Sequence, residues 1–234
     1  CAACAKPLAY DALQCFHCHT RYCDAACQNE HWANGHKKKC KKIARAGGAE
    51  AHYADKKAKE AAAEAVRQSM VPAGTSCFIC RGESSTDGVV SLTCQCAGEM
   101  KFVHISCLVG RARADVSNRS DTNLRDASGL SDAWRRCKNC GNIHEGPIAI
   151  ALSWEWWNWA VTTLPDASFF RGMALYSLPN VYFENDEFDK AIPLFGAVLS
   201  WQRRSDPSGK TELITLGRLS EAYLEVGRVD EGLR

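Results

Sequence analysis

The sequence predicts two small α+β modules stabilised by metal, followed by an all-α helical repeat. Three observations carry this prediction. All 14 cysteines of the 234-residue chain fall within residues 1–40 and 77–140, mostly in closely spaced pairs. Between the two clusters the composition shifts to Ala, Lys and Glu, which are strong helix formers. Near the end, an apolar pattern recurs after 41 residues, as in helical repeats.

The first module, residues 1–40, has eight Cys and His side chains at the spacing of zinc ligands. In order these are Cys1, Cys4, Cys15, Cys18, Cys23, Cys27, His36 and Cys40. Each close pair can place two ligands on one zinc ion, and a tetrahedral structural site needs two pairs, so eight ligands make two sites. His36 and Cys40 are four residues apart, which places them on one face of a helix.

The run from Tyr22 to Trp32, Tyr-Cys-Asp-Ala-Ala-Cys-Gln-Asn-Glu-His-Trp, resembles the corresponding phrase of MYND-type zinc fingers. That family's pattern implies one zinc on Cys1, Cys4, Cys23 and Cys27 and another on Cys15, Cys18, His36 and Cys40. One extra residue, Gly35, departs from the pattern. It leaves His31 as an alternative ligand, although the offset to Cys40 favours His36.

MYND fingers are peptide-docking modules, and the resemblance assigns that contact to Gln28 and Trp32. Trp32 has a second interpretation, as a cover for the small core beside the zinc site, and one indole can serve both purposes. His17 and His19 flank a ligand and are predicted to be exposed bystanders.

Residues 41–72 are predicted to form a helical linker rich in Ala, Lys and Glu. They lack an apolar stripe wide enough for a core, so we predict a solvated spacer helix. It should begin after Gly47-Gly48 and end before Val71-Pro72. The basic run at 37–42 is interpreted as a solvated helix end that partly offsets thiolate charge, rather than as a nucleic-acid or localisation patch.

The second module, residues 73–146, again has eight ligands and therefore two predicted sites. They are Cys77, Cys80, Cys94, Cys96, His104, Cys107, Cys137 and Cys140. Their order, the single residue between Cys94 and Cys96, and the seven residues before His104 resemble the RING-CH (RING-variant) finger. The resemblance implies one zinc on Cys77, Cys80, His104 and Cys107, and the other on Cys94, Cys96, Cys137 and Cys140.

A PHD finger shares this ligand order and is the alternative for the second module. PHD fingers usually have a shorter gap before the His and an aromatic residue two positions ahead of the seventh ligand. Here Trp134 lies three positions ahead of Cys137. Residues 108–136 form a long insert, and we expect its polar middle, residues 117–123, to be mobile.

Residues 147–165 are predicted to form a Trp-rich helix. Trp154, Trp157 and Val161 share one side of it, so it should pack the finger against the C-terminal part of the chain. A stacking platform for nucleic acid is disfavoured, since no basic residues are interleaved. Glu155 and Asn158 interrupt the apolar stretch, which makes it a poor bilayer-spanning segment.

Residues 166–234 contain the repeat. Leu175, Leu178, Tyr182, Phe188, Asp189 and Ala191 recur as Leu216, Leu219, Tyr223, Val229, Asp230 and Gly232. The spacing resembles tetratricopeptide (TPR) repeats of the kinesin-light-chain type, although Pro179 departs from that pattern, and a plain helical hairpin is the alternative. Solenoids need about three repeats. Because the sequence stops within the second repeat and begins at a ligand without a methionine, we expect a fragment of a longer protein.

The ligand count predicts four zinc ions, since 16 ligands form four sets of four. With 14 thiolates and four divalent ions the formal charge falls from +2 to about −4, so nucleic acid is an unexpected partner. No signal peptide is evident, and Cys-x2-Cys pairs with interposed histidines indicate metal sites rather than disulfides. We therefore expect an intracellular protein, in the reducing cytoplasm or nucleus.

Two functions fit these features. The first is a zinc-binding scaffold for protein–protein interactions, because no catalytic triad, phosphate loop or open metal site stands out. The alternative, implied by the resemblance, is a RING-CH ubiquitin ligase that holds a ubiquitin-conjugating enzyme, while the MYND and TPR regions bind substrate. Ile79 matches that family's apolar contact and should be exposed. Arg111 stands where members often carry a Trp, for which Trp134 is a candidate substitute.

Overall fold

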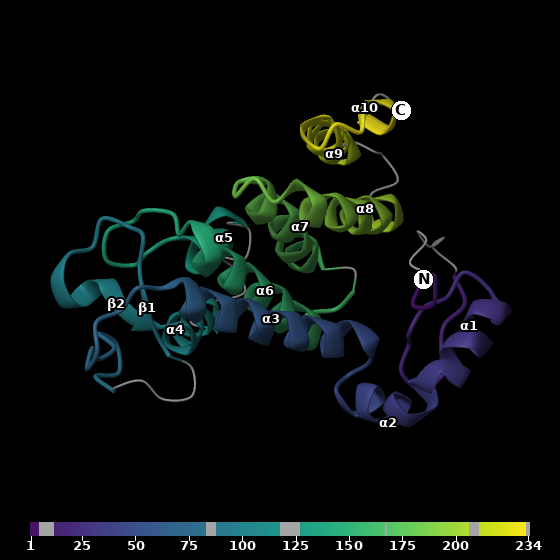
Figure 1. Ribbon diagram of the computed structural model, residues 1–234, viewed down its shortest axis with the longest axis horizontal. Coiled ribbons are helices and arrows are strands. Elements are labelled where there is room, and N and C mark those ends of the chain that lie inside the picture. Colours follow the sequence, from purple (N-terminus) through teal and green to yellow (C-terminus); the bar gives the residue numbers. More distant parts are fainter. Residues whose placement is uncertain (5–11, 83–87, 118–126, 167, 206–210, 233–234) are drawn as a thin grey trace.

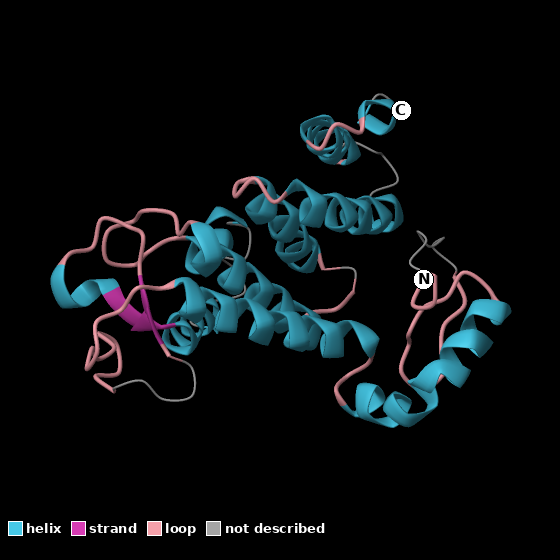
Figure 2. Ribbon diagram, in the orientation of Figure 1, coloured by secondary structure: helices cyan, strands magenta, loops and turns pink. Residues whose placement is uncertain are grey.

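The computed structural model describes residues 1–4, 12–82, 88–117, 127–166, 168–205 and 211–232, which are predominantly helical (Figure 2). The elements are α1 (Ala25–His31), the π-helical turn η1 (Trp32–His36), α2 (Lys37–Arg45), α3 (Ala49–Gln68), β1 (Val89–Ser91), η2 (Gly98–Lys101), β2 (Phe102–His104), α4 (Ile105–Ser117), α5 (Ala127–Arg135), α6 (Gly146–Thr163), α7 (Phe169–Phe183), α8 (Phe188–Ser205), α9 (Glu212–Glu225) and α10 (Val229–Gly232).

The long helix α3 runs between the two ends of the molecule (Figure 1). The N-terminal module, with α1 and α2, lies at one end, and the antiparallel pair β1–β2 with α4 lies at the other. Helices α6, α7 and α8 lie along the same side of α3, and α9 with α10 follows at the C-terminus (Figure 1). The two cysteine-rich modules are thus held apart by a helical framework.

Helix α3 corrects the prediction of a solvated spacer. It does begin directly after Gly47-Gly48, but its alanines Ala54, Ala58 and Ala65 are buried in the main core, where α3 packs on α6. The methyl groups are small enough to let the α3 backbone approach the bulky tryptophans of α6 closely. The prediction was wrong because an alanine stripe is a sufficient core face when the partner supplies the volume.

Helix α6 is the centre of the core. Trp154, Trp156 and Trp157 are all buried there. The Trp156 ring stacks on Trp134 of α5, with centroids 6.4 Å apart and planes 7° apart. On another side of α6, helix α7 packs against it and supplies Tyr182, which is also buried. The Trp-rich helix therefore joins the second module to the C-terminal helices.

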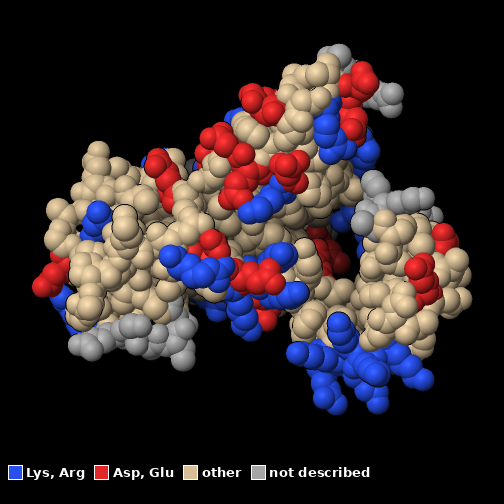
Figure 3. All heavy atoms as spheres, viewed as in Figure 1, with Lys and Arg blue, Asp and Glu red and all other residues tan. Residues whose placement is uncertain are grey.

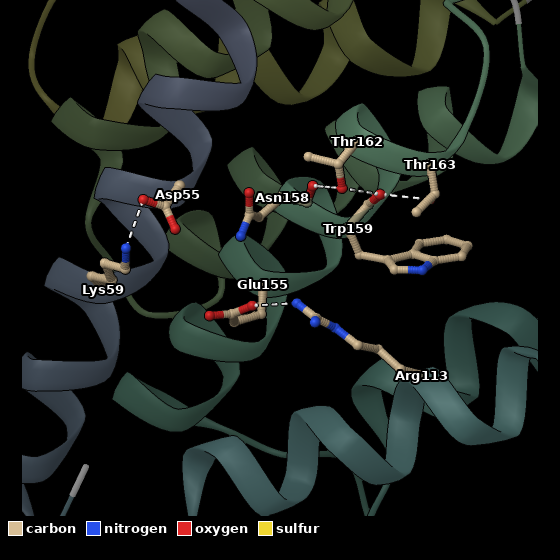
Figure 4. Close-up of polar contacts among 8 residues, drawn as sticks. All are labelled: Asp55, Lys59, Arg113, Glu155, Asn158, Trp159, Thr162 and Thr163. Atoms are coloured by element: carbon tan, nitrogen blue, oxygen red, sulfur yellow. Dashed lines mark hydrogen bonds and ion pairs between the residues drawn. The ribbon is translucent and has the colours of Figure 1, made fainter. Parts of the chain in front are cut away.

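A polar junction fixes α4 against α6 (Figure 4). Arg113 of α4 forms an ion pair of 3.2 Å with Glu155 of α6, whose side chain is largely enclosed. Burial raises the pKa of the Glu155 carboxyl, while the charge of Arg113 acts in the opposite direction. On α3, Lys59 pairs with Asp55 at 2.8 Å. The first helix after the His104 ligand is thereby tied to the framework by charge as well as by apolar contact.

The insert predicted between the sixth and seventh ligands is largely helical. Helix α4 and helix α5 occupy its two ends, and Leu130, Ala133 and Trp134 are buried. The segment predicted to be mobile, residues 117–123, lies outside the described residues except for Ser117.

The C-terminal helices pack in sequence, α7 on α8, α8 on α9 and α9 on α10. Pro179 lies within α7 and is buried. Among the helices described, none combines the length and the apolar character that crossing a bilayer requires.

Candidate metal centres

Sixteen Cys and His side chains converge into four groups. Within each group the ligand atoms all lie within 4.8 Å of one another. The groups are Cys1, Cys4, Cys23 and Cys27; Cys15, Cys18, His36 and Cys40; Cys77, Cys80, His104 and Cys107; and Cys94, Cys96, Cys137 and Cys140. All 14 cysteines are free thiols. In each module the ligand pairs of the two groups alternate along the sequence. Metal binding at both groups therefore ties both ends of the module into one unit.

The spacing of the ligand atoms fits tetrahedral zinc. A Zn–S bond of about 2.3 Å places two sulfurs of one site roughly 3.8 Å apart. The Sγ atoms of Cys15 and Cys40 are 3.6 Å apart, as are those of Cys96 and Cys137. The Nδ1 atom of His104 lies 3.4 Å from the Cys80 sulfur. These distances are far too long for disulfides, and the donor sets are those of structural zinc sites.

Three of the Cys-x2-Cys pairs share one backbone turn. The N–H of the first cysteine donates to the carbonyl five residues ahead, and its carbonyl accepts from the N–H four residues ahead. For Cys77 these partners are Gly82 at 2.9 Å and Arg81 at 2.8 Å. The corresponding partners are Thr20 and His19 for Cys15, and Asn142 and Gly141 for Cys137.

The residue four positions into each turn has a positive φ. The values are 57° for His19, 60° for Arg81 and 76° for Gly141. This conformation is strained for residues with a side chain. Sequence reasoning did not identify this positive φ, and Gly141 is the one residue of the three whose type is typical of it. His19 thus contributes its backbone to the turn. The side chains of His17 and His19 are exposed, and neither belongs to any of the four groups.

Backbone N–H groups aimed at sulfur favour the thiolate form that a metal requires. Burial acts to raise the pKa of the Cys77 thiol, but N–H groups including those of Cys80 and His104 outweigh it, and the pKa is lowered. The His104 N–H lies 3.3 Å from the Cys77 sulfur. The N–H of Asn142 lowers the pKa of Cys140 to about 7. The thiolate form is thus favoured at these two ligands, whereas burial raises the pKa of the Cys96 and Cys107 thiols.

The structure brings His36, and not His31, into the first module's second cluster. The Nε2 atom of His36 lies 3.3 Å from the Cys18 sulfur. The Nδ1 atom of His31 instead lies 2.9 Å from the hydroxyl of the buried Tyr22. The extra residue Gly35 lies in η1 at a kink between two helical segments, where its φ is +113° and the backbone is not helical. Glycine adopts this positive φ at little steric cost, so the kink takes up the extra residue while His36 and Cys40 still reach one cluster.

Gln28 and Trp32 lie on adjacent turns, in α1 and η1. Gln28 is half-buried, and Trp32 is 38% exposed. The Trp32 ring centroid lies 5.8 Å from that of His36. The indole therefore covers the cluster with one part and faces solvent with another.

On the second module, two expectations need correction. Ile79 is not freely exposed, because it is half-buried and packs against the main core. Trp134 cannot be an exposed anchor, since it is only 2% exposed and is stacked on Trp156. Sequence reasoning placed the insert at the surface, whereas its second helix contributes this indole to the core.

Arg111 lines a cavity of about 20 Å³ between α4 and the Cys137–Cys140 turn. Leu108, Lys138 and Asn139 also line it, and Ile79 does not. The side chain of Arg111 is partly exposed there. A small concave site with cationic groups at its edge therefore lies beside the last pair of ligands.

Comparison with known proteins agrees with this geometry. Residues 77–119 match the RING-variant domain family. A stretch of 38 residues is 45% identical to the ERAD-associated E3 ubiquitin-protein ligase DOA10 of Saccharomyces cerevisiae, covering 16% of this chain and 3% of that protein. No solved structure matches. The family match favours the RING-variant finger over the PHD alternative. It ends before Cys137 and Cys140, which the structure adds to the module's second cluster. The chain thus contains a RING-variant (RING-CH) domain at residues 77–119.

Proposed function

We propose that this chain is a RING-CH-type ubiquitin ligase. The observation that carries the proposal is a RING-variant match at residues 77–119 whose six ligands form two complete clusters together with Cys137 and Cys140. The similarity to a relative named as an E3 ubiquitin-protein ligase supports it. In this function the domain binds a conjugating enzyme that carries ubiquitin as a thioester, and ubiquitin passes to a lysine amine.

Zinc, when bound, holds the two ligand loops in a fixed relation and takes no part in the bond changes. The chain's own residues make the contact surface. The exposed part of Ile79 and the adjoining surface of α4 are the proposed docking area for the conjugating enzyme. Arg111 places a guanidinium where a large apolar anchor would add most to the binding energy. We therefore propose that transfer is slow.

The N-terminal module is proposed to be a MYND-type finger, and the two modules together to hold four zinc ions. Partly exposed Trp32, with Gln28 on the preceding turn, is the proposed contact for peptides that include the ligase's substrates.

Helices α7 to α10 are proposed to be TPR-like and to present a second protein-binding surface. The free thiols of all 14 cysteines suit a reducing compartment, which we propose is the cytoplasm or nucleus.

A scaffold that binds proteins without transferring ubiquitin is the second candidate. Arg111 favours it, since a charged side chain in place of an apolar anchor weakens the docking of a conjugating enzyme. In that case the same surfaces gather partners, and zinc serves the fold alone.

The discriminating experiment is an auto-ubiquitination assay of the chain with a panel of conjugating enzymes. Ubiquitin chains formed by the wild type and lost in Cys94→Ser, which removes a ligand, support the ligase. His19→Ala is the matched control and should retain transfer. Absence of transfer with every enzyme in the panel, from protein with full zinc content, leaves the scaffold.

A further inference from the structure

Helix α2 carries six cations on one continuous face. They are Lys37, Lys38, Lys39, Lys41, Lys42 and Arg45. At 3.6 residues per turn they occupy an arc of about 200°. The remaining arc holds Cys40, Ile43 and Ala44, which pack into the small core of the N-terminal module. Figure 3 shows the cations as a cluster that projects from this end of the molecule.

These cations have no counter-ions within the described part of the chain. All six side chains are exposed, and none takes part in an ion pair there. By contrast, Lys56, Lys57 and Lys59 of α3 all pair with acidic residues. Lys37 and Lys41, like Lys38 and Lys42, are four residues apart, a spacing at which like charges destabilise a helix. No acidic side chain in the described ranges therefore pairs with this face.

The adjacent metal cluster offsets only a small part of this charge. Three thiolates and one neutral imidazole around a divalent ion leave a net charge of about −1 at the cluster that contains Cys40. Compensation of thiolate charge at this cluster therefore accounts for only one of the six positive charges on α2. Among the described residues 12–46, the acids are Asp24 and Glu30, and the Asp24 carboxylate accepts the Cys27 N–H instead.

We propose that this basic face of α2 binds the phosphate backbone of a nucleic-acid duplex. A flat bilayer would meet only one side of an arc this wide, and interfacial helices also bury an apolar face, which in α2 is already packed. A duplex groove admits a helix and presents phosphates on both sides of it. Five of the six cations are lysines, which contact phosphate as point charges and carry no bidentate base recognition, so binding is independent of sequence.

The test uses the zinc-loaded full chain and a short fluorescent DNA duplex, with affinity measured by anisotropy between about 50 and 200 mM NaCl. Five phosphate contacts give a slope of log affinity against log salt of roughly −4 to −5. In Lys38→Gln/Lys41→Gln/Lys42→Gln the slope should become shallower by about 3, with at least about tenfold weaker binding at low salt.

Lys56→Gln/Lys57→Gln/Lys59→Gln is the matched control, because it removes the same charge from α3 and should leave both affinity and slope nearly unchanged. Zinc content and circular dichroism establish that both variants are folded. The proposal fails if the duplex does not bind, if the α2 variant binds as the wild type does, or if the control weakens binding equally. Tighter binding to phosphatidylserine vesicles or to polyglutamate, at equal charge concentration, also overturns it. None of these outcomes depends on ubiquitin transfer.

Discussion

The indole N–H of Trp154 donates a hydrogen bond of 2.9 Å to the hydroxyl of Tyr182. Both side chains are buried, and they come from α6 and α7. Burial raises the pKa of the Tyr182 hydroxyl, so the phenol stays protonated at neutral pH. This bond joins the helix that packs against the second module to the C-terminal helices.

Tyr182→Phe should lower the free energy of unfolding by about 1–3 kcal/mol, because it leaves the buried Trp154 N–H without an acceptor. Thermal denaturation followed by circular dichroism measures the change. Tyr176→Phe, on the same helix but half-buried, is the control and should change stability little. Equal losses in the two variants would show that the hydrogen bond contributes nothing specific.

Cys94→Ser should release one metal ion and unfold the second module, since the remaining three ligands cannot close a tetrahedral site. His19→Ala should retain all metal, because His19 belongs to no cluster. Elemental analysis of the purified variants gives the metal content directly. Loss of metal from His19→Ala, or full metal in Cys94→Ser, contradicts the ligand assignment.

Chelation should unfold the N-terminal module and the ligand loops of the second, because metal-binding energy there is folding energy. The α7–α8 pair should persist, since Leu178, Phe195 and Val198 form an apolar core that needs no metal. Hydrogen exchange before and after addition of a chelator distinguishes the regions. Loss of protection throughout α7 and α8 would mean that their stability also depends on the metal sites.

Stability should fall as pH drops below about 6.5, because His144 is buried in its neutral form. Burial lowers its pKa from 6.5 to about 4, so the folded state binds fewer protons than the unfolded state. The stabilisation that neutral His144 contributes is fully present above pH 6.5. It is lost as the pH falls from 6.5 towards 4. By pH 5.5 the loss should be about 1 kcal/mol.

Urea denaturation at pH 7.5 and 5.5 measures this effect, with metal content checked at each pH because protonated thiolates release zinc. His144→Gln should reduce the difference between the two pH values. The exposed His17, changed to Gln, should leave it intact. A pH dependence that is the same in all three proteins would assign it to groups other than His144.

The sequence was most informative where the chemistry is local. Two cysteines separated by two residues must lie close together, so spacing identified the candidate ligands as close pairs, while the resemblance to the two finger families implied how the pairs combine. The sequence could not show how the chain accommodates Gly35, because the kink at that residue depends on how the two clusters hold α1 and α2 on either side of it. Nor could it show the positive φ of Arg81, since a lysine or arginine carries no signal for that conformation.

Long-range packing lay beyond the sequence for a physical reason. Whether Ala58 is solvated or buried depends on what faces it, and the tryptophans of α6 lie nearly a hundred residues away. The buried Arg171 is a second case. Its guanidinium pairs with Glu50 and Asp166 and lies over the Trp157 ring, at a junction of α3, α6 and α7 that no local pattern indicates.

Single-turnover discharge of a conjugating enzyme measures the proposed ligase activity directly. A conjugating enzyme loaded with ubiquitin is mixed with free lysine, and loss of the thioester is followed with and without the chain. We expect faster discharge with the wild type, and a loss of that acceleration in Ile79→Ala but not in Ile214→Ala, which changes an exposed residue of α9. Because Ile79 is half-buried, the variants are compared at equal zinc content. Wild-type protein with full zinc that accelerates discharge from no conjugating enzyme would contradict the ligase.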